Sequence, residues 1–144
     1  MSRYQTIACE TPASSDTVGL KPSIVIALSI DGTQIRSWCF VDDFVDGVLR
    51  CAENPAAIGQ AFNLGNPQGT ATNFELANLI IRLTNSKSEI IFKPHPGPEV
   101  DLRVPSIEKA MTLLGFKPTV SLEAGVSQAI AWYRENYDAV AGKR

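Results

Sequence analysis

The sequence predicts an α/β or α+β fold with a small mixed sheet and about four helices. Short β-branched and apolar runs alternate irregularly with helical patterns that carry strong start signals. With 144 residues, 44% hydrophobic and 19% charged, the chain is globular in composition and long enough for a core. Residues 1–20 are polar and small without periodicity, so we expect a flexible N-terminal lead followed by one domain over 21–144.

The elements around the first half of the chain follow from local signals. Asp31-Gly32 favours a tight turn, so the strand predicted at 23–30 should pair as a hairpin with a strand at 35–41. Asp42 is expected as the N-cap of a helix from about residue 43 to residue 53. That helix should end before Asn54-Pro55 because a residue before proline disfavours helix.

The second half contains further caps and strands. Thr72 and Glu75 have the spacing of a capping box, which predicts a helix that runs to about Thr84. Other expected elements are short strands at 60–63 and 89–93, a rigid loop at 94–98, a third helix that Ser106 caps and Gly115 ends, and a last helix that Ser121 caps.

Two arginines and one turn are candidate binding features. Arg36 lies inside an apolar strand, and Arg103 lies in a loop flanked by proline. Each is either a solvated cation or an anion ligand, because a guanidinium group matches the geometry of a carboxylate or phosphate. The turn 63–66 clusters amides and backbone groups after a predicted strand, with Asn63 and Gly65 as its candidate contacts. Without further information the local pattern favours solvated arginines and a structural turn.

Other polar groups have simpler explanations. His95 lies between two prolines, where a surface residue is more common than a catalyst. The carboxylates of Asp42, Asp43 and Asp46 fit capping and compensation of the helix dipole, and a metal would need further ligands. We therefore predict no metal site.

The charge, the cysteines and the hydropathy of the sequence indicate which partners and which cellular compartment to expect. A net charge of −2 gives no basic footprint for nucleic acid. Three cysteines without metal-ligand spacing are expected to be free thiols in a reducing compartment. The longest apolar run is too short to cross a membrane, and no secretory signal follows Met1. We therefore predict a cytoplasmic protein without nucleic-acid or membrane partners.

Two motifs of dinucleotide-dependent enzymes are missing from the sequence. No glycine-rich G-x-G-x-x-G turn follows a strand. None of the three tyrosines has a lysine four positions later, and neither a nucleophile elbow nor a P-loop is present.

The order of several segments resembles the NAD-dependent sugar-nucleotide epimerase/dehydratase family of extended short-chain dehydrogenases. Within it the pattern is most similar to UDP-glucuronate decarboxylases (UDP-xylose synthases). The resemblance covers about residues 22–138. Its segments are Gly32-Thr-Gln-Ile-Arg-Ser-Trp-Cys-Phe-Val-Asp-Asp-Phe-Val-Asp-Gly47, Phe62-Asn-Leu-Gly-Asn-Pro67, Glu89-Ile-Ile-Phe-Lys93, Arg103-Val-Pro-Ser-Ile107, Leu113-Leu-Gly-Phe-Lys-Pro118 and Ser121-Leu-Glu-Ala-Gly125.

The resemblance implies a fold and a binding role. The chain looks like the C-terminal half of such an enzyme without the main Rossmann domain, the half that holds the nucleotide-sugar. Arg36 and Arg103 fall on positions that contact the UDP diphosphate in the family. The family reaction is oxidation at C4 by NAD, loss of the C6 carboxylate as carbon dioxide, and reduction.

The resemblance also leaves two functions open. The NAD loop and the Tyr/Lys pair are absent here, so we expect no catalysis by this chain alone. A separate Rossmann-domain chain would have to supply NAD. The alternative is an interaction or oligomerisation module, or a truncated gene product, whose binding groove is vestigial.

Overall fold

The computed structural model describes residues 8–10, 25–29, 31–94 and 100–140. These residues belong to two compact units. Unit 1 combines residues 1–34 with 72–101, and unit 2 combines 35–71 with 102–144. The predicted division into a lead and one domain at residue 21 stays a prediction, and each unit is described by itself.

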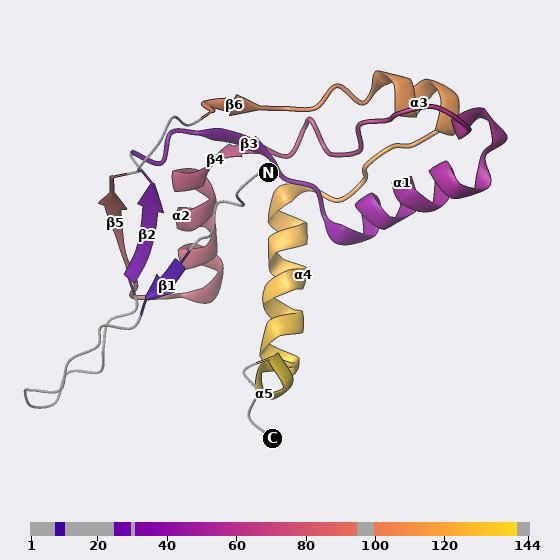
Figure 1. Ribbon diagram of the computed structural model, residues 1–144. Helices are drawn as coiled ribbons and strands as arrows, with labels where there is room; N and C mark the ends of the chain where they lie inside the picture. Colours follow the sequence, from indigo (N-terminus) through magenta and orange to yellow (C-terminus); the bar gives the residue numbers. More distant parts are fainter. Residues whose placement is uncertain (1–7, 11–24, 30, 95–99, 141–144) are drawn as a thin grey trace, which may run out of the picture. The chain divides into compact units, whose positions relative to one another are not determined.

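Unit 1 contains a mixed three-stranded sheet in the order β1-β2-β5 (Figure 1). Strand β1 (Ala8–Glu10) is antiparallel to β2 (Val25–Ser29), and β2 is parallel to β5 (Glu89–Lys93). The predicted strands at 23–30 and 89–93 are thereby confirmed. Strand β1 was not expected, because it is short and lies within the residues predicted as a lead.

Helix α2 (Asn73–Thr84) packs on β2 and begins at the predicted capping box. The Thr72 hydroxyl accepts from the Glu75 backbone N–H at 3.0 Å, and the Glu75 carboxylate accepts from the Thr72 backbone N–H at 2.8 Å. The helix ends at Asn85, whose φ of 51° is left-handed. This predicted helix is confirmed at both ends.

The predicted hairpin between residues 23–30 and 35–41 is wrong. Strand β2 pairs with β1 and β5, whereas the next strand, β3 (Ile35–Ser37), belongs to the second sheet. The turn itself forms as expected, because Gly32 has a φ of 72°. Its carbonyl accepts from the Phe74 backbone N–H at 3.0 Å, so the turn is attached to α2 and does not close a hairpin.

Unit 2 contains the second sheet, in the order β4-β3-β6. Strand β4 spans Thr70–Thr72 and β6 spans Leu102–Arg103. Strand β3 is parallel to β6. Neither β4 nor β6 was predicted, β3 is shorter than the strand expected at 35–41, and the strand expected at 60–63 is irregular backbone.

Five α-helices and one 3₁₀ turn complete the described chain. Besides α2 they are α1 (Val41–Glu53), η1 (Pro55–Ala57), α3 (Glu108–Leu114), α4 (Leu122–Glu135) and α5 (Tyr137–Val140). The fold class, a mixed α/β arrangement with a small sheet, is confirmed. No helix in the described ranges has the length and apolar composition that crossing a membrane requires.

Of the four predicted caps besides Thr72, two are wrong and two are confirmed. The N-caps of α1 and α3 are Phe40 and Ile107, and neither makes a side-chain capping bond. Asp42 and Ser106 are therefore not caps. Gly115 ends α3 with a φ of 63°, and the Ser121 hydroxyl accepts from Ala124 at the start of α4.

The core of unit 2 lies around α3. It consists of Ile107, Ala110, Leu114 and Phe116, with Leu64 among the half-buried residues packed on it. Helix α1 approaches this core through Gly47, where a Cβ atom would lie 3.0 Å from side-chain atoms of both Leu64 and Phe116. An added side chain at this position would require Leu64 or Phe116 to shift, so glycine favours this close packing.

Candidate functional site

The register of two short strands brings the predicted arginines together. In the parallel pair of β3 and β6, Ile35 is the partner of Leu102 and Arg36 is the partner of Arg103. Neighbouring strands are about 4.8 Å apart, and side chains of register partners project from the same face. Arg36 and Arg103 therefore share one face of this sheet.

The two arginines differ in their surroundings. Arg36 is half-buried, and its Nη1 donates to the Ile35 carbonyl at 3.1 Å. Arg103 is exposed. Two guanidinium groups side by side on neighbouring strands are an arrangement that can bind an anion.

Asn63 and Gly65 contact the segment that follows Arg103. The Asn63 amide donates to the Ser106 carbonyl at 3.3 Å. A Cβ atom on Gly65 would lie 2.8 Å from Cγ of Pro105. The turn therefore packs against the backbone just after β6, and the predicted contact of Asn63 and Gly65 with a substrate stays a prediction.

Asn66, the last residue of the same turn, connects three segments and is not among the predicted contacts. It is buried, and its amide nitrogen donates to the Val120 carbonyl at 3.1 Å. Its amide oxygen accepts from the Gln68 backbone N–H at 3.0 Å, and its carbonyl accepts from the Ser37 hydroxyl at 2.7 Å. The sequence feature that indicates a structural role for Asn66 is its position directly before Pro67, because asparagine next to proline is typical of turns.

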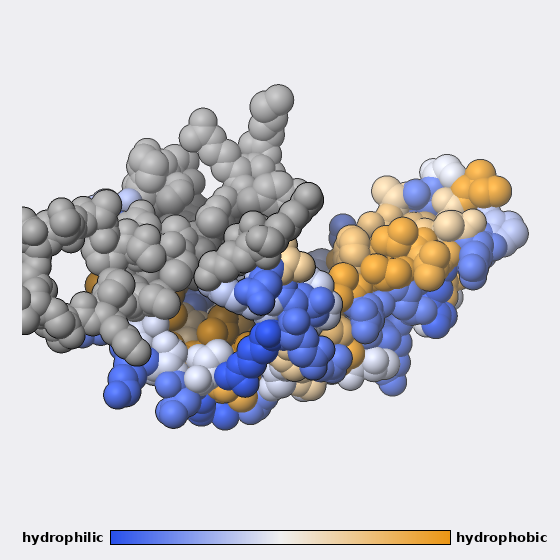
Figure 2. Space-filling view, turned by 90° about the horizontal axis from the view of Figure 1, so that it is seen from below, coloured by the Kyte–Doolittle hydropathy of each residue, from blue (hydrophilic) through white to orange (hydrophobic). Residues whose placement is uncertain are grey.

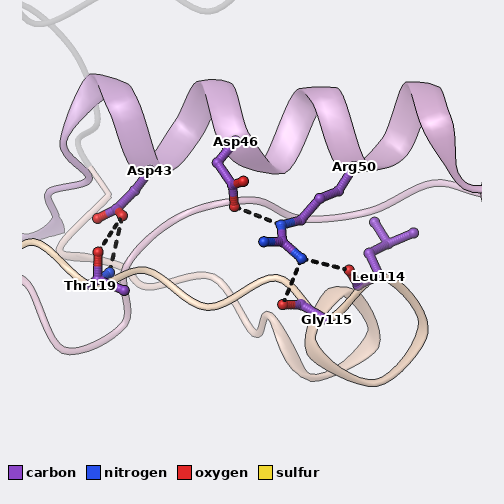
Figure 3. A network of polar contacts seen from close by, with 6 residues as sticks. All are labelled: Asp43, Asp46, Arg50, Leu114, Gly115 and Thr119. Atoms are coloured by element: carbon purple, nitrogen blue, oxygen red, sulfur yellow. Dashed lines mark hydrogen bonds and ion pairs between the residues drawn. The ribbon is translucent and has the colours of Figure 1, made fainter.

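One acidic residue of α1, Asp43, binds the chain after α3 (Figure 3). Asp43 is only 7% exposed, and its carboxylate accepts from the backbone N–H groups of Thr119 and Val120 at 3.0 and 2.9 Å. The expectation that capping and dipole compensation explain this carboxylate is therefore incomplete. The sequence did not predict these hydrogen bonds, because Thr119 and Val120 lie far along the chain from Asp43.

Arg50 provides a second link between α1 and α3. Its Nε donates to the Asp46 carboxylate at 2.7 Å, and its Nη1 donates to the carbonyls of Leu114 and Gly115 at 3.3 and 3.2 Å (Figure 3). The hydrogen bond to Asp46 raises the pKa of Arg50 above its usual value. The guanidinium group thus satisfies carbonyls at the C-terminal end of α3.

Each unit has a pocket, and neither is lined by the four predicted site residues in the described chain. The pocket of unit 2 has a volume of about 340 Å³. Pro105 and Ser106 line it together with Asn66, so it adjoins the segment after Arg103. An open groove of about 530 Å³ runs along α2 in unit 1.

His95 lies outside the described residues, so its predicted surface role stays a prediction. Among the described residues, no group of three or more His, Cys, Asp and Glu side chains is arranged to hold a metal ion. Cys39 and Cys51 are free thiols. Burial raises the pKa of Cys39, and the nearby charge of Asp43 adds to that shift.

Residues 14–65 match the NAD-dependent epimerase/dehydratase family. UDP-glucuronic acid decarboxylase 2 of Arabidopsis thaliana is 39% identical over 105 residues, which are 73% of this chain and 23% of the relative. The chain therefore spans about a quarter of the length of the curated relatives that it matches.

Solved structures of epimerases are also similar to this chain. Epimerase Mth375 from Methanothermobacter thermautotrophicus matches with a TM-score of 0.76 at 30% identity, over 83% of this chain and 35% of that chain. UDP-glucuronic acid 4-epimerase from Bacillus cereus, solved with UDP-glucuronic acid and NAD, has a TM-score of 0.72 at 25% identity, over 79% and 36%. By sequence and by structure, the chain belongs to the NAD-dependent epimerase/dehydratase family.

Proposed function

We propose that unit 2 binds the diphosphate of a nucleotide-sugar, with Arg36 and Arg103 as its two ligands. The observation that carries this proposal is the β3–β6 register, which puts both residues on one face of a sheet. Two guanidinium groups in that arrangement can each make charge-assisted, forked hydrogen bonds to phosphate oxygens. The repulsion between them is then offset by the bound anion.

UDP-sugars are the ligand class that the relatives support. One similar structure was solved with UDP-glucuronic acid and another with UDP-glucose. UDP-glucuronic acid decarboxylases are among the relatives by sequence. In this proposal Asn63 and Gly65 hold the segment after β6, so that Arg103 meets the ligand at a fixed position.

NAD does not fit the described residues. A dinucleotide-binding turn joins a strand to a helix through closely spaced glycines. Here β3 leads to α1 through Trp38–Phe40, β4 leads directly into α2, and β6 leads to α3 through Val104–Ile107. None of these connections contains a glycine, so we derive no catalytic step through NAD. A partner chain that carries the cofactor is part of the proposal.

We also propose that this chain alone does not catalyse a reaction. The described residues provide ligands for a diphosphate and a positioning turn, and we assign no proton-transfer or nucleophilic role to any of them. This chain alone is therefore proposed to bind a nucleotide-sugar without converting it. The free thiols of Cys39 and Cys51 support a reducing compartment, and we propose the cytoplasm.

Calorimetric titration with UDP tests the clamp. Replacing both Arg36 and Arg103 by alanine should weaken binding by more than about 100-fold, because each of the two substitutions removes hydrogen bonds to a charged group worth about 1.5–3 kcal/mol. The matched control replaces Arg82 and Arg134 by alanine, which removes the same formal charge from the last turns of α2 and α4. This control should bind UDP as the wild type does.

The design separates a clamp from general attraction between charges. Uridine, which lacks the diphosphate, should give no comparable heat. A folded wild-type protein that does not bind UDP contradicts the proposal, as does equal weakening in the clamp variant and its control. Circular dichroism confirms that each variant is folded.

A second candidate function, association with another polypeptide, has a separate observation in its favour. Unit 2 leaves large apolar side chains exposed, including Phe44 on α1 and Trp132 on α4. Such surfaces are typical of interaction sites. This function does not require Arg36 and Arg103, so the titration above distinguishes it from the clamp.

A further inference from the structure

One buried hydrogen-bond donor in unit 2 lacks a partner. It is the indole N–H of Trp38, and among the residues that the structure describes it is the only buried side-chain nitrogen or oxygen without a hydrogen bond. A tryptophan N–H can only donate, and buried donors are nearly always paired because an unpaired one costs free energy. The unpaired N–H therefore indicates an acceptor from outside the chain.

Trp38 continues strand β3 on the face that carries the two arginines. Its backbone N–H donates to the Gly69 carbonyl at 2.9 Å, so the hydrogen bonding of β3 with the segment that leads into β4 extends one residue past Ser37. Side chains two residues apart on an extended strand share a face. Trp38 is therefore placed on the face of Arg36 and of its register partner Arg103.

The neighbours of Trp38 hold its backbone and leave the indole N–H unpaired. A Cβ atom on Gly69 would collide with the Trp38 carbonyl oxygen, so this close approach of two backbones requires glycine. The Ser37 hydroxyl donates to the Asn66 carbonyl at 2.7 Å and fixes the next residue of β3. The position of Trp38 beside the arginines is thus set by contacts that do not involve its ring nitrogen.

We propose that the Trp38 indole N–H is a third ligand of the nucleotide-sugar site and donates to a hydroxyl oxygen of a ring joined to the diphosphate. This inference rests on the proposed diphosphate clamp and deepens it. Two residues of a strand span roughly 6.6 Å, which is farther than the width of one phosphate group. A neutral donor at that spacing from Arg36 suits a neutral hydroxyl, whereas the guanidinium groups suit the charged oxygens.

The ligand reaches this donor through a movement of side chains. Trp38 as a whole is half-buried, so part of the residue faces solvent although its N–H is covered. Changes of side-chain rotamer are common when a complex forms. The hydrogen bond is then made only in the complex, while the unpaired N–H destabilises the free protein. Removing the N–H should therefore weaken binding without lowering stability, which a purely structural tryptophan would not show.

An isostere without the N–H tests this role. In β-(3-benzothienyl)alanine a sulfur atom stands where the indole has its N–H, and the ring keeps its shape. With this residue in place of Trp38, calorimetric titration with UDP-glucose should show about threefold to tenfold weaker binding, as expected for the loss of one neutral hydrogen bond. The melting temperature of the ligand-free protein should be unchanged or higher. Trp38→Phe is the simpler variant, but it also removes volume, so the isostere decides.

A series of three ligands locates the hydroxyl group. Inorganic diphosphate has no ring, so the isosteric variant should bind it as the wild type does. A loss of affinity for UDP-glucose alone assigns the hydroxyl to the sugar, and an equal loss for UDP and UDP-glucose assigns it to the ribose. An equal loss for inorganic diphosphate would show that Trp38 acts on the clamp itself, which overturns the proposal.

Two controls match the change at Trp38. The same isostere in place of Trp132, which is 53% exposed on α4, should leave all three affinities unchanged. Val45→Ser controls for attraction of a ligand ring to apolar surface, because Val45 is exposed on α1. Figure 2 shows apolar side chains gathered where α1 lies in Figure 1. This variant should also bind as the wild type does.

Failure of the clamp and failure of this inference give different results. A folded wild type that binds none of the three ligands contradicts the clamp and, with it, the role of Trp38. If the wild type binds UDP-glucose and the isosteric variant binds it equally well, only the role of Trp38 is contradicted. A lower melting temperature of the ligand-free isosteric variant also contradicts it, because the N–H would then have a partner in the folded protein.

Discussion

The Asp43 carboxylate accepts hydrogen bonds from both the backbone N–H and the hydroxyl of Thr119, at 3.0 and 3.1 Å. The same carboxylate accepts from the backbone N–H of Val120. A single buried side chain near the start of α1 therefore satisfies backbone donors in the segment between α3 and α4. Removing it leaves those donors without their partner.

Replacing Asp43 by alanine should lower the free energy of unfolding by about 2–4 kcal/mol, because three hydrogen bonds from Thr119 and Val120 to a charged acceptor are lost. The neighbouring Asp42 is exposed and is the matched control. Its replacement by alanine should cost about 0.5 kcal/mol, through the helix dipole alone. Urea denaturation followed by circular dichroism measures both. Similar losses in the two variants would contradict the assignment.

Gly65 is expected to tolerate no side chain while Pro105 is present. A Cβ atom at residue 65 would lie 2.8 Å from the proline ring, which cannot rotate away. The Gly65→Ala variant should lose about 1–3 kcal/mol of unfolding free energy, as overpacked sites do.

The double variant Gly65→Ala, Pro105→Ala tests the cause of this loss. Alanine at residue 105 has no Cγ, so the added methyl group gains room. A double-mutant cycle should show favourable coupling between the two positions. Additive losses would show that the contact with the proline ring is not responsible. If the turn positions Arg103, affinity for UDP should recover along with stability.

The capping box of α2 predicts a response to acid. Hydrogen bonds from Thr72 hold the pKa of Glu75 below its usual value of 4.5. A carboxyl group whose pKa is lower in the folded state adds stability above its unfolded pKa and loses that stability as the pH falls through the folded value. The wild type should therefore lose part of its stability below pH 4.5, and Glu75→Gln should lose less over that window. Thermal melts from pH 6 downward measure the difference, and identical pH profiles would refute it.

Cys39 should react slowly with alkylating reagents at neutral pH. Burial raises the pKa of its thiol, and the charge of Asp43 contributes in the same direction. Less thiolate, and hence less of the reactive form, is then present than in an unfolded chain. The rate of iodoacetamide labelling at Cys39, followed by mass spectrometry, should increase on denaturation in urea at fixed pH. Equal rates in the folded and unfolded protein would contradict this.

The features that the sequence predicted correctly depend on neighbours within a few residues. The capping box at Thr72, the left-handed Gly115 and the Ser121 cap are all local motifs whose geometry the backbone adopts without distant contacts. The hairpin failed because alternation identifies a strand without identifying its partner. Strand β2 instead pairs with β5, far along the chain.

In the candidate site, too, the sequence predicted residues but not their long-range contacts. Arg36 and Arg103 could be named from their residue type and from the family pattern. Their adjacency depends on a register between strands of two and three residues, which no local signal specifies. The local pattern predicts only a helix-dipole role for Asp43, since its partners lie in a segment that no short motif connects to it.

The parallel pairing of β3 with β6 also affects how the protein unfolds. Strand β3 belongs to the first segment of unit 2 and β6 to the second. The ladder between these two strands consists of two residue pairs. In the proposed clamp, an anion bound by both Arg36 and Arg103 would act as a removable cross-link between those segments. By mass action it raises the free energy of unfolding by RT ln(1 + [L]/Kd) for a ligand that binds only the folded state. Thermal stability would then track the concentration of nucleotide-sugar around the protein.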